Sequence, residues 1–114
     1  MNLHRLCATS DLADPGSRGF SLMLDSGPLD LFVVHRGGQF HAWRNSCPHR
    51  GTPLDWNPDE FLDDEGEHIV CATHGALFDI KNGICLMGPC SGQGLIPLKV
   101  LEENGELFLE VDPD

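Results

Sequence analysis

The sequence predicts an all-β protein, built as a small antiparallel β-sandwich or barrel. Short stretches of apolar, often β-branched residues recur along the chain, and turn-forming residues separate them. The 114 residues include 13 glycines and 8 prolines, a composition that favours many turns and short strands over long helices. Short strands at regular spacing with few helical stretches are typical of small β-sandwiches and barrels.

The N-terminal part of the chain supplies two predicted strands and a turn. Residues 1–10 alternate loosely between apolar and polar side chains, which predicts a first short strand. Residues 14–17 (Asp-Pro-Gly-Ser) predict a turn, because proline presets one backbone dihedral and glycine accepts a positive φ. Residues 20–24 predict the second strand.

The clearest hairpin of the sequence comes next. Residues 29–35 are apolar and partly β-branched, residues 36–38 (Arg-Gly-Gly) predict a turn, and residues 39–43 return with a period of two. This hairpin leads directly into a loop that contains Cys47 and His49.

The stretch 55–67 has no regular period. It holds seven acidic residues together with Trp56, Phe61 and Leu62. We expect a solvated excursion, with one short helical turn at most, rather than a buried element. Its carboxylates are expected to form a solvated face, and docking on a basic partner is the alternative. Residues 68–70 predict a short strand that follows.

Another hairpin follows a second loop. Residues 77–80 and 84–87 flank Lys81-Asn82-Gly83, and the Asn-Gly pair favours the positive φ of a tight turn. Residues 88–92 (Gly-Pro-Cys-Ser-Gly) predict a rigid loop.

The last hairpin closes the predicted fold. Residues 98–101 and 106–111 read as strands, and Asn104-Gly105 marks the turn between them. We see no internal repeat and no linker, so the sequence predicts a single domain over residues 1–114.

Composition and charge exclude several classes of protein. No apolar run is long enough to cross a membrane, and the N-terminus lacks the pattern of a secretory signal. The net charge of −11 disfavours nucleic acid and anionic membranes as partners, but it fits contact with a basic patch on another protein. Five cysteines are an odd number, which argues against a fully paired disulfide framework and favours the cytoplasm.

The chemistry of the chain is concentrated in two short loops. Residues 47–51 read Cys-Pro-His-Arg-Gly and residues 71–75 read Cys-Ala-Thr-His-Gly, with 21 residues between His49 and Cys71. Each loop offers one thiolate and one imidazole. Two Cys and two His also satisfy tetrahedral zinc, so a structural zinc site is the first alternative. A disulfide between Cys47 and Cys71 would leave both histidines unexplained.

The pattern C-x-H … C-x2-H resembles the signature of Rieske proteins, in which two loops hold one 2Fe–2S cluster. The resemblance implies a cluster-binding part at about residues 45–92, with Cys47 and Cys71 on one iron and His49 and His74 on the other. Two ferric ions, two sulfides and two thiolates sum to zero formal charge. Neutral imidazoles therefore make reduction easier than four thiolates would.

Further residues carry or qualify the resemblance, which covers about residues 39–101. Residues 74–79 resemble the family run H-G-x-x-F-D, and Gly88-Pro89 falls where Rieske proteins carry a third loop that covers the cluster. High-potential members place an extra disulfide-forming Cys in each ligand loop, where this chain has Thr52 and Thr73. Hydroxyl donors to the sulfurs are also missing, which predicts the low end of the roughly −150 to +300 mV Rieske range.

The remaining Cys, His and Trp residues have structural interpretations. Cys7, Cys85 and Cys90 are expected to be buried small hydrophobes, although Cys85 and Cys90 could pair under oxidation. The histidines outside the loops are expected at the surface; they are His4, His35, His41 and His68. Trp43 and Trp56 are expected in the core or over the site.

The resemblance implies an electron-transfer protein rather than an enzyme. The chain is similar to the small Rieske ferredoxins that take one electron from a flavin or ferredoxin reductase and pass it to a terminal oxygenase. The Rieske-like small subunit of a redox complex such as nitrite reductase is the alternative within the family, and a zinc-stabilised interaction module is the alternative outside it. The chain is too short to add the second domain of a complete oxygenase.

Overall fold

The computed structural model describes residues 2–25, 27–46, 54, 59–71, 75–88 and 93–111. These residues form β-strands and one short 3-10 helix, η1 (Thr9–Asp11). The strands are β1 (Asn2–Ala8), β2 (Gly16–Leu24), β3 (Gly27–Arg36), β4 (Gln39–Arg44), β5 (His68–Cys71), β6 (Ala76–Asp79), β7 (Cys85–Met87), β8 (Pro97–Glu103) and β9 (Glu106–Val111). Within the described part of the chain, no helix is long and apolar enough to span a bilayer.

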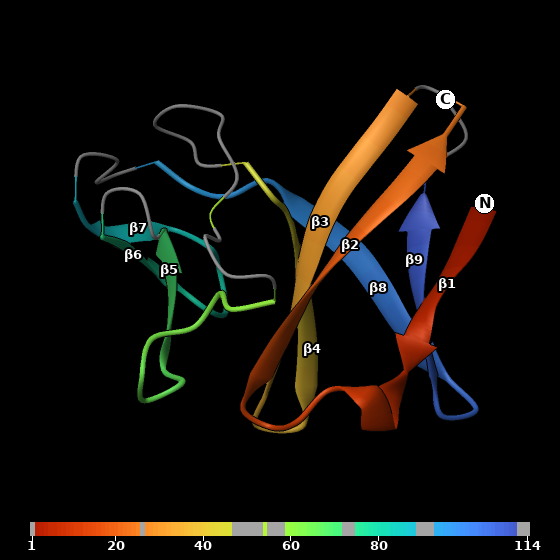
Figure 1. Ribbon diagram of the computed structural model, residues 1–114, viewed down its shortest axis with the longest axis horizontal. Coiled ribbons are helices and arrows are strands. Elements are labelled where there is room, and N and C mark those ends of the chain that lie inside the picture. The colour runs from red at the N-terminus through yellow and green to blue at the C-terminus, as the bar shows by residue number, and fades with distance from the viewer. Residues whose placement is uncertain are drawn as a thin grey trace.

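The strands make two antiparallel sheets (Figure 1). One sheet has six strands in the order β1-β9-β8-β4-β3-β2, and it curls into an incomplete barrel; the other has three strands in the order β5-β6-β7 and lies beside the barrel. The predicted all-β sandwich or barrel is therefore confirmed. The two sheets divide the molecule into a barrel and a smaller part that contains the second Cys/His loop.

Two hairpin turns have the geometry that the sequence predicts. Gly37 (φ 63°) and Gly38 (φ 78°) join β3 to β4, and Asn104 (φ 53°) and Gly105 (φ 78°) join β8 to β9. Two consecutive positive φ values match the right-handed twist of the flanking strands, and glycine and asparagine reach them most readily. The Arg-Gly-Gly and Asn-Gly predictions are confirmed.

The turn predicted at residues 14–17 differs from the structure, because β2 already begins at Gly16. The bend lies earlier, at a cis Asp14–Pro15 peptide bond. The Asp14 carboxylate accepts the backbone N–H groups of Gly37 (2.9 Å) and Gly38 (2.8 Å). Asp14 thus stabilises the β3–β4 turn, a role that local turn patterns cannot reveal, since the partners are 23 and 24 residues away.

The side chains of β3 alternate between two hydrophobic cores. Leu31 and Val33 face the interior of the barrel, whereas Phe32 and Val34 face the core between the barrel and the small sheet. All four are fully buried. A strand covered on both faces reads as a continuous apolar run, which explains the unbroken hydrophobic stretch in the sequence.

Trp43 and Gly83 lock the two sheets together. Trp43 extends from β4 into the core between the sheets and is only 4% exposed, as expected for a core tryptophan. A Cβ atom at Gly83, in the β6–β7 turn, would lie 2.6–3.0 Å from carbons of the indole ring. Any other residue at this position would push the sheets apart.

The described part of the acidic stretch, residues 59–67, is not a solvated excursion, contrary to the sequence-based expectation. Phe61 is fully buried, and its ring stacks on that of Phe32 with centroids 4.3 Å apart. Leu62 forms a β-bridge with Ile69, so this segment extends the small sheet beside β5. No helix occurs in the described part of the segment. The acidic composition of the segment therefore gave no indication that Phe61 is buried in the core.

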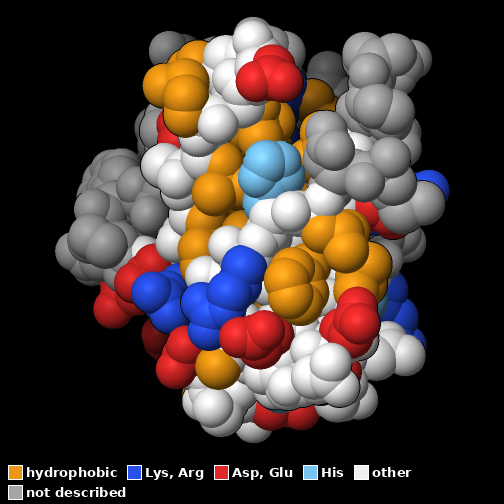
Figure 2. All heavy atoms as spheres, turned by 90° about the vertical axis from the view of Figure 1, so that its right-hand side faces the viewer, with side chains coloured by type: hydrophobic (Ala, Val, Ile, Leu, Met, Phe, Trp, Pro, Cys, Tyr) orange, Lys and Arg blue, Asp and Glu red, His pale blue; other side chains and the backbone are white. Residues whose placement is uncertain are grey.

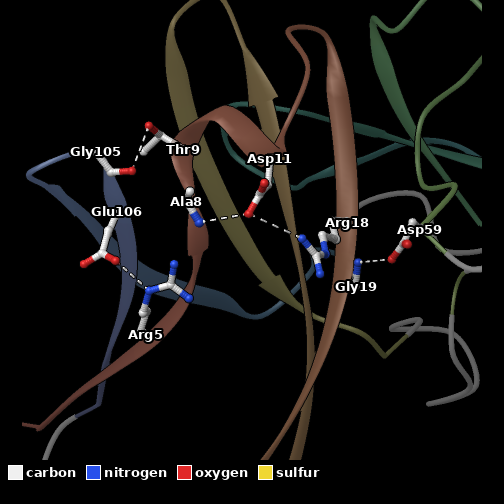
Figure 3. Close-up of polar contacts among 9 residues, drawn as sticks. All are labelled: Arg5, Ala8, Thr9, Asp11, Arg18, Gly19, Asp59, Gly105 and Glu106. Carbon is white, nitrogen blue, oxygen red and sulfur yellow. Dashed lines mark hydrogen bonds and ion pairs between the residues drawn. The ribbon is translucent and has the colours of Figure 1, made fainter.

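The barrel is open between its edge strands, β1 and β2. The Asp11 carboxylate accepts the Ala8 N–H (3.1 Å) and lies 4.0 Å from the Arg18 guanidinium, so it links η1 and β1 to β2 (Figure 3). Figure 2 views the molecule from this side and shows a band of apolar side chains above a group of charged ones. Side-chain contacts, rather than a ladder of main-chain hydrogen bonds, connect these two edges.

Candidate metal centre

Cys71 is the one predicted ligand that falls within the described residues. It is the last residue of β5, and its side chain is fully buried in the core between the sheets. It carries a thiol and is not disulfide-bonded, so the alternative Cys47–Cys71 disulfide is wrong. Cys47, His49 and His74 lie outside the described residues and remain predicted ligands.

The first loop is tied down at both ends. Asn45 directly follows β4, and its backbone N–H donates to the Asp30 carbonyl (2.9 Å). The Asn45 side-chain oxygen accepts the N–H of Leu54 (2.8 Å), and Leu54 is fully buried. The Asn45 side chain therefore holds together the two ends of the stretch 46–53, which contains Cys47 and His49.

The second loop is the tight connection between β5 and β6. Cys71 pairs with Ala76 in the antiparallel register, and the Gly75 N–H donates to the Cys71 carbonyl (2.8 Å). Gly75 has a φ of 68°, a backbone conformation that glycine adopts without the strain of a Cβ atom. Only four residues, 72–75, connect the two strands, and the first three of them, which include His74, lie outside the described residues.

The end of β7 packs on the base of the second loop. A Cβ atom at Gly88 would lie 3.0 Å from the Cα and Cβ atoms of Ala76, which leaves no room for a side chain. Gly88 also has a φ of 111°. The predicted third loop, residues 88–92, therefore starts against the strand that leaves the second loop; Pro89 and Cys90 lie outside the described residues.

The environment of Cys71 fits a thiolate ligand of a metal cluster. Its neighbours in the core include Ala76 and Phe78, and the thiol lies where two strands meet at a closed turn. Soft thiolates in dry, apolar surroundings suit iron–sulfur clusters. Within the described ranges, no three His, Cys, Asp or Glu residues converge on another possible metal site.

The other cysteines have structural surroundings. Cys7 is buried in the barrel core, and burial raises the pKa of its thiol, which keeps it protonated and unreactive. Cys85 is buried and disulfide-bonded, and its partner lies outside the described residues. The expected burial of Cys7 and Cys85 is confirmed.

Two histidines have partners that the sequence did not indicate. His35 is half-buried rather than solvated: its Nδ1 lies 3.1 Å from the Leu12 carbonyl and its ring stacks on Phe40 at 4.1 Å. His68 Nδ1 lies 3.0 Å from a carboxylate oxygen of Asp63. The spacing of five residues between Asp63 and His68 is not a ligand motif, and a bend in the chain brings the two together.

Two carboxylates of the acidic segment have structural partners. Asp59 accepts the Gly19 N–H (2.8 Å), and Asp63 accepts the backbone N–H groups of Glu67 (2.8 Å) and His68 (3.2 Å). Burial acts to raise the pKa of Asp63, but these hydrogen bonds and the His68 ring outweigh it and hold the pKa below its usual value. Three other exposed carboxylates of the segment form what we call the acidic trio: Asp64, Glu65 and Glu67.

Two antiparallel sheets and a thiol buried where two strands meet agree with a metal-binding β domain, and comparison with known proteins identifies its family. The Rieske [2Fe-2S] domain matches residues 2–103. The chain therefore belongs to the Rieske 2Fe–2S domain family.

The similar proteins are small redox components. The chain is 31% identical over 108 residues to ferredoxin CarAc of Metapseudomonas resinovorans, covering 92% of this chain and 90% of that protein. It is 33% identical over 84 residues to the ferredoxin component of biphenyl 2,3-dioxygenase from Rhodococcus jostii (strain RHA1), covering 73% and 69%. A solved complex of reduced oxygenase and oxidized ferredoxin in carbazole 1,9a-dioxygenase contains a chain with 26% identity, a TM-score of 0.73 and coverage of 94% and 91%.

Proposed function

We propose that this protein is a one-electron carrier that holds a single Rieske-type 2Fe–2S cluster. Cys47 and Cys71 would bind one iron, and His49 and His74 the other. The cluster supplies reversible one-electron chemistry, and the protein performs no bond-making step of its own. The observation that carries this proposal is the family match over residues 2–103, which spans both Cys/His loops.

The described residues support specific roles in holding the cluster. Asn45 fixes the two ends of the first loop, and the Gly75 N–H closes the second. Burial of Cys71 excludes water from the side of the sheet, which protects a thiolate ligand from exchange. An electron would then enter and leave on the side of the cluster away from the buried Cys71.

The partners are proposed from the relatives. They are ferredoxin components of a biphenyl 2,3-dioxygenase and a carbazole 1,9a-dioxygenase, and the latter is solved in complex with its oxygenase. We infer that this chain receives an electron from a flavin or ferredoxin reductase and delivers it to a terminal oxygenase. The acidic trio would face the electron donor, because exposed charge steers short-lived redox encounters.

Electron paramagnetic resonance tests the proposal directly. The protein is purified anaerobically, assayed for iron and acid-labile sulfide, and reduced with dithionite. We expect two irons and two sulfides per chain, and a lower average g value than an all-cysteine 2Fe–2S cluster gives. A folded, colourless sample that contains zinc would instead support the zinc module and refute the carrier.

We place the protein in the cytoplasm, where an electron carrier meets its reductase. The disulfide at Cys85 bears on this, since disulfides are rare in reducing compartments. Alkylation of freshly lysed cells followed by mass spectrometry reports the state of Cys85 in vivo. Complete alkylation of Cys85 agrees with the cytoplasm, whereas a persistent disulfide argues for an oxidising location.

A further inference from the structure

Two Asn-Gly pairs lie in hairpin turns of the structure. Asn82-Gly83 lies between β6 and β7, and Asn104-Gly105 lies between β8 and β9. Asparagine is chemically labile when a glycine follows it, because a residue without a side chain leaves its backbone nitrogen open to approach. The two pairs consist of the same two residues, so the surrounding structure decides which of them can react.

The reaction is an intramolecular substitution at the side-chain amide. The backbone nitrogen of the glycine attacks Cγ of the asparagine: the N–Cγ bond forms, the Cγ–Nδ2 bond breaks, and Nδ2 leaves as ammonia with the proton of the backbone nitrogen. Solvent water then opens the cyclic imide at either of its carbonyl carbons and gives an aspartate or an isoaspartate. No electron is transferred, and water is the co-reactant. The step requires a backbone nitrogen and an amide carbon that are free to approach each other.

Both reacting groups of the first pair are held in place. The Asn82 side-chain oxygen accepts the Ile84 N–H (2.9 Å), and the Gly83 N–H donates to the Asp79 carbonyl (2.8 Å). Gly83 is also buried, and its backbone lies against the indole ring of Trp43. Attack at this pair would break two hydrogen bonds and withdraw Gly83 from the contact between the two sheets.

The second pair has neither restraint. Asn104 and Gly105 are exposed, and a Cβ atom at Gly105 would meet nothing within 4 Å. Among the described residues, no hydrogen bond forms to the Asn104 side chain or from the Gly105 N–H. The turn is held instead through the Gly105 carbonyl, which accepts the Thr9 N–H (2.9 Å) and the Thr9 hydroxyl (3.2 Å). An exposed turn with so few contacts opens at low cost in free energy, so its two reacting groups can meet.

We propose that Asn104 is a deamidation site of the folded protein and that the structure protects Asn82. Both products place a carboxylate between Glu103, the last residue of β8, and Glu106, the first of β9, and the isoaspartate also lengthens the main chain of this two-residue turn. The Gly105 carbonyl belongs to the same turn, so its contact with Thr9, which ties η1 to the hairpin, weakens in the modified protein. The β8–β9 turn lies away from the small sheet, so the modification is remote from that sheet (Figure 1).

Peptide mapping of the aged holoprotein tests the proposal, because trypsin separates the two pairs. Cleavage after Lys81 and Lys99 gives the peptides 82–99 and 100–114, and each contains one Asn-Gly pair. The protein is incubated at mildly alkaline pH; samples are then reduced, alkylated and digested briefly at mildly acidic pH. Mass spectrometry measures the acid form of each peptide against a time-zero sample. The chain denatured in guanidinium chloride is the matched control, because sequence alone sets the two rates there.

In the folded holoprotein we expect Asn104 to deamidate about tenfold faster than Asn82 or more, whereas the two rates in the denatured chain should agree within about threefold. Asn104→Ser should abolish the change in peptide 100–114 and leave the rate in peptide 82–99 as it is. A protein-isoaspartate methyltransferase with labelled S-adenosylmethionine counts the isoaspartate that forms. Asn104→Asp carries the aspartate product from the start, and it should keep the iron content and visible spectrum of the wild type.

Three outcomes would overturn the proposal. The first is a rate at Asn82 that equals or exceeds the rate at Asn104 in the folded protein. The second is a folded protein in which neither asparagine reacts although both react in the denatured chain, because the exposed turn would then be protected too. The third is the same ratio of rates in the folded and denatured protein, since sequence alone would then explain the difference. None of these outcomes depends on the cluster or on a redox partner, so they leave the proposed function to its own test.

Discussion

The buried ring of Phe61 provides the sharpest test of how the acidic segment is held. Phe61 is fully buried and stacks on Phe32, so Phe61→Ala removes a complete aromatic ring from a closed core. Substitutions of this kind cost about 3–5 kcal/mol, and the lost ring pair favours the upper half of that range. For 114 residues, an unfolding entropy of about 2.1 cal/mol/K per residue converts this loss into a midpoint about 12–20 °C lower.

The assay is thermal unfolding of the holoprotein, followed by far-UV circular dichroism. Two scan rates are compared, because unfolding with cofactor loss is not a simple equilibrium. Phe108→Ala is the control: Phe108 lies on β9 and is half-buried, so its removal should lower the midpoint by less than half as much.

The same variant should disturb the cluster site. The Val70 N–H donates to the Phe61 carbonyl (2.9 Å), and Val70 directly precedes Cys71. Loosening this segment should therefore speed the loss of visible cluster absorbance on heating. If Phe61→Ala shifts the midpoint by less than about 4 °C, a cost near 1 kcal/mol, the acidic segment is not anchored as we describe.

Three further predictions concern charge. Hydrogen bonds from the backbone N–H groups of Gly38 and Gly37 hold the pKa of Asp14 below its usual value. The Asp14 carboxylate therefore adds stability at pH values above the carboxyl pKa of the unfolded chain, and this stability is lost as the pH falls through the pKa of the folded protein. The thermal unfolding midpoint of Asp14→Asn should depend less on pH between about pH 5 and 2 than that of the wild type, and parallel pH curves for the two proteins would refute this. His49→Cys or His74→Cys should lower the reduction potential measured by voltammetry, because a thiolate adds negative charge, and a raised potential would contradict the ligand assignment. Neutralising the acidic trio should slow reduction by the reductase severalfold at low salt, and an unchanged salt dependence would refute its docking role.

Local patterns predicted most of the strands and turns. Alternating and continuous apolar runs located the strands, and Gly-Gly and Asn-Gly pairs located two hairpins, because these features depend on neighbours in sequence. The prediction failed where distant residues decide the structure. The seven carboxylates of the stretch 55–67 predict a solvated position for Phe61, yet its environment is set by contact with Phe32.

Prediction of the site shows the same division. Paired Cys and His residues at short spacing indicated a metal centre, and the buried thiol of Cys71 agrees with that interpretation. Spacing did not reveal how the loops are held, since the Asn45–Leu54 hydrogen bond crosses nine positions and Gly88 is required by a contact with Ala76. Nor did it separate the structural carboxylates, Asp59 and Asp63, from the acidic trio.

The Trp43–Gly83 contact has a consequence for how the potential of such a carrier can be adjusted. The indole ring of Trp43 packs directly against the backbone of Gly83, and this contact holds the small sheet on the barrel. The scaffold under the cluster should therefore keep one shape in both oxidation states, so little nuclear rearrangement would accompany each electron. Differences in reduction potential between related carriers must then come from the residues of the loops, because the scaffold keeps one shape.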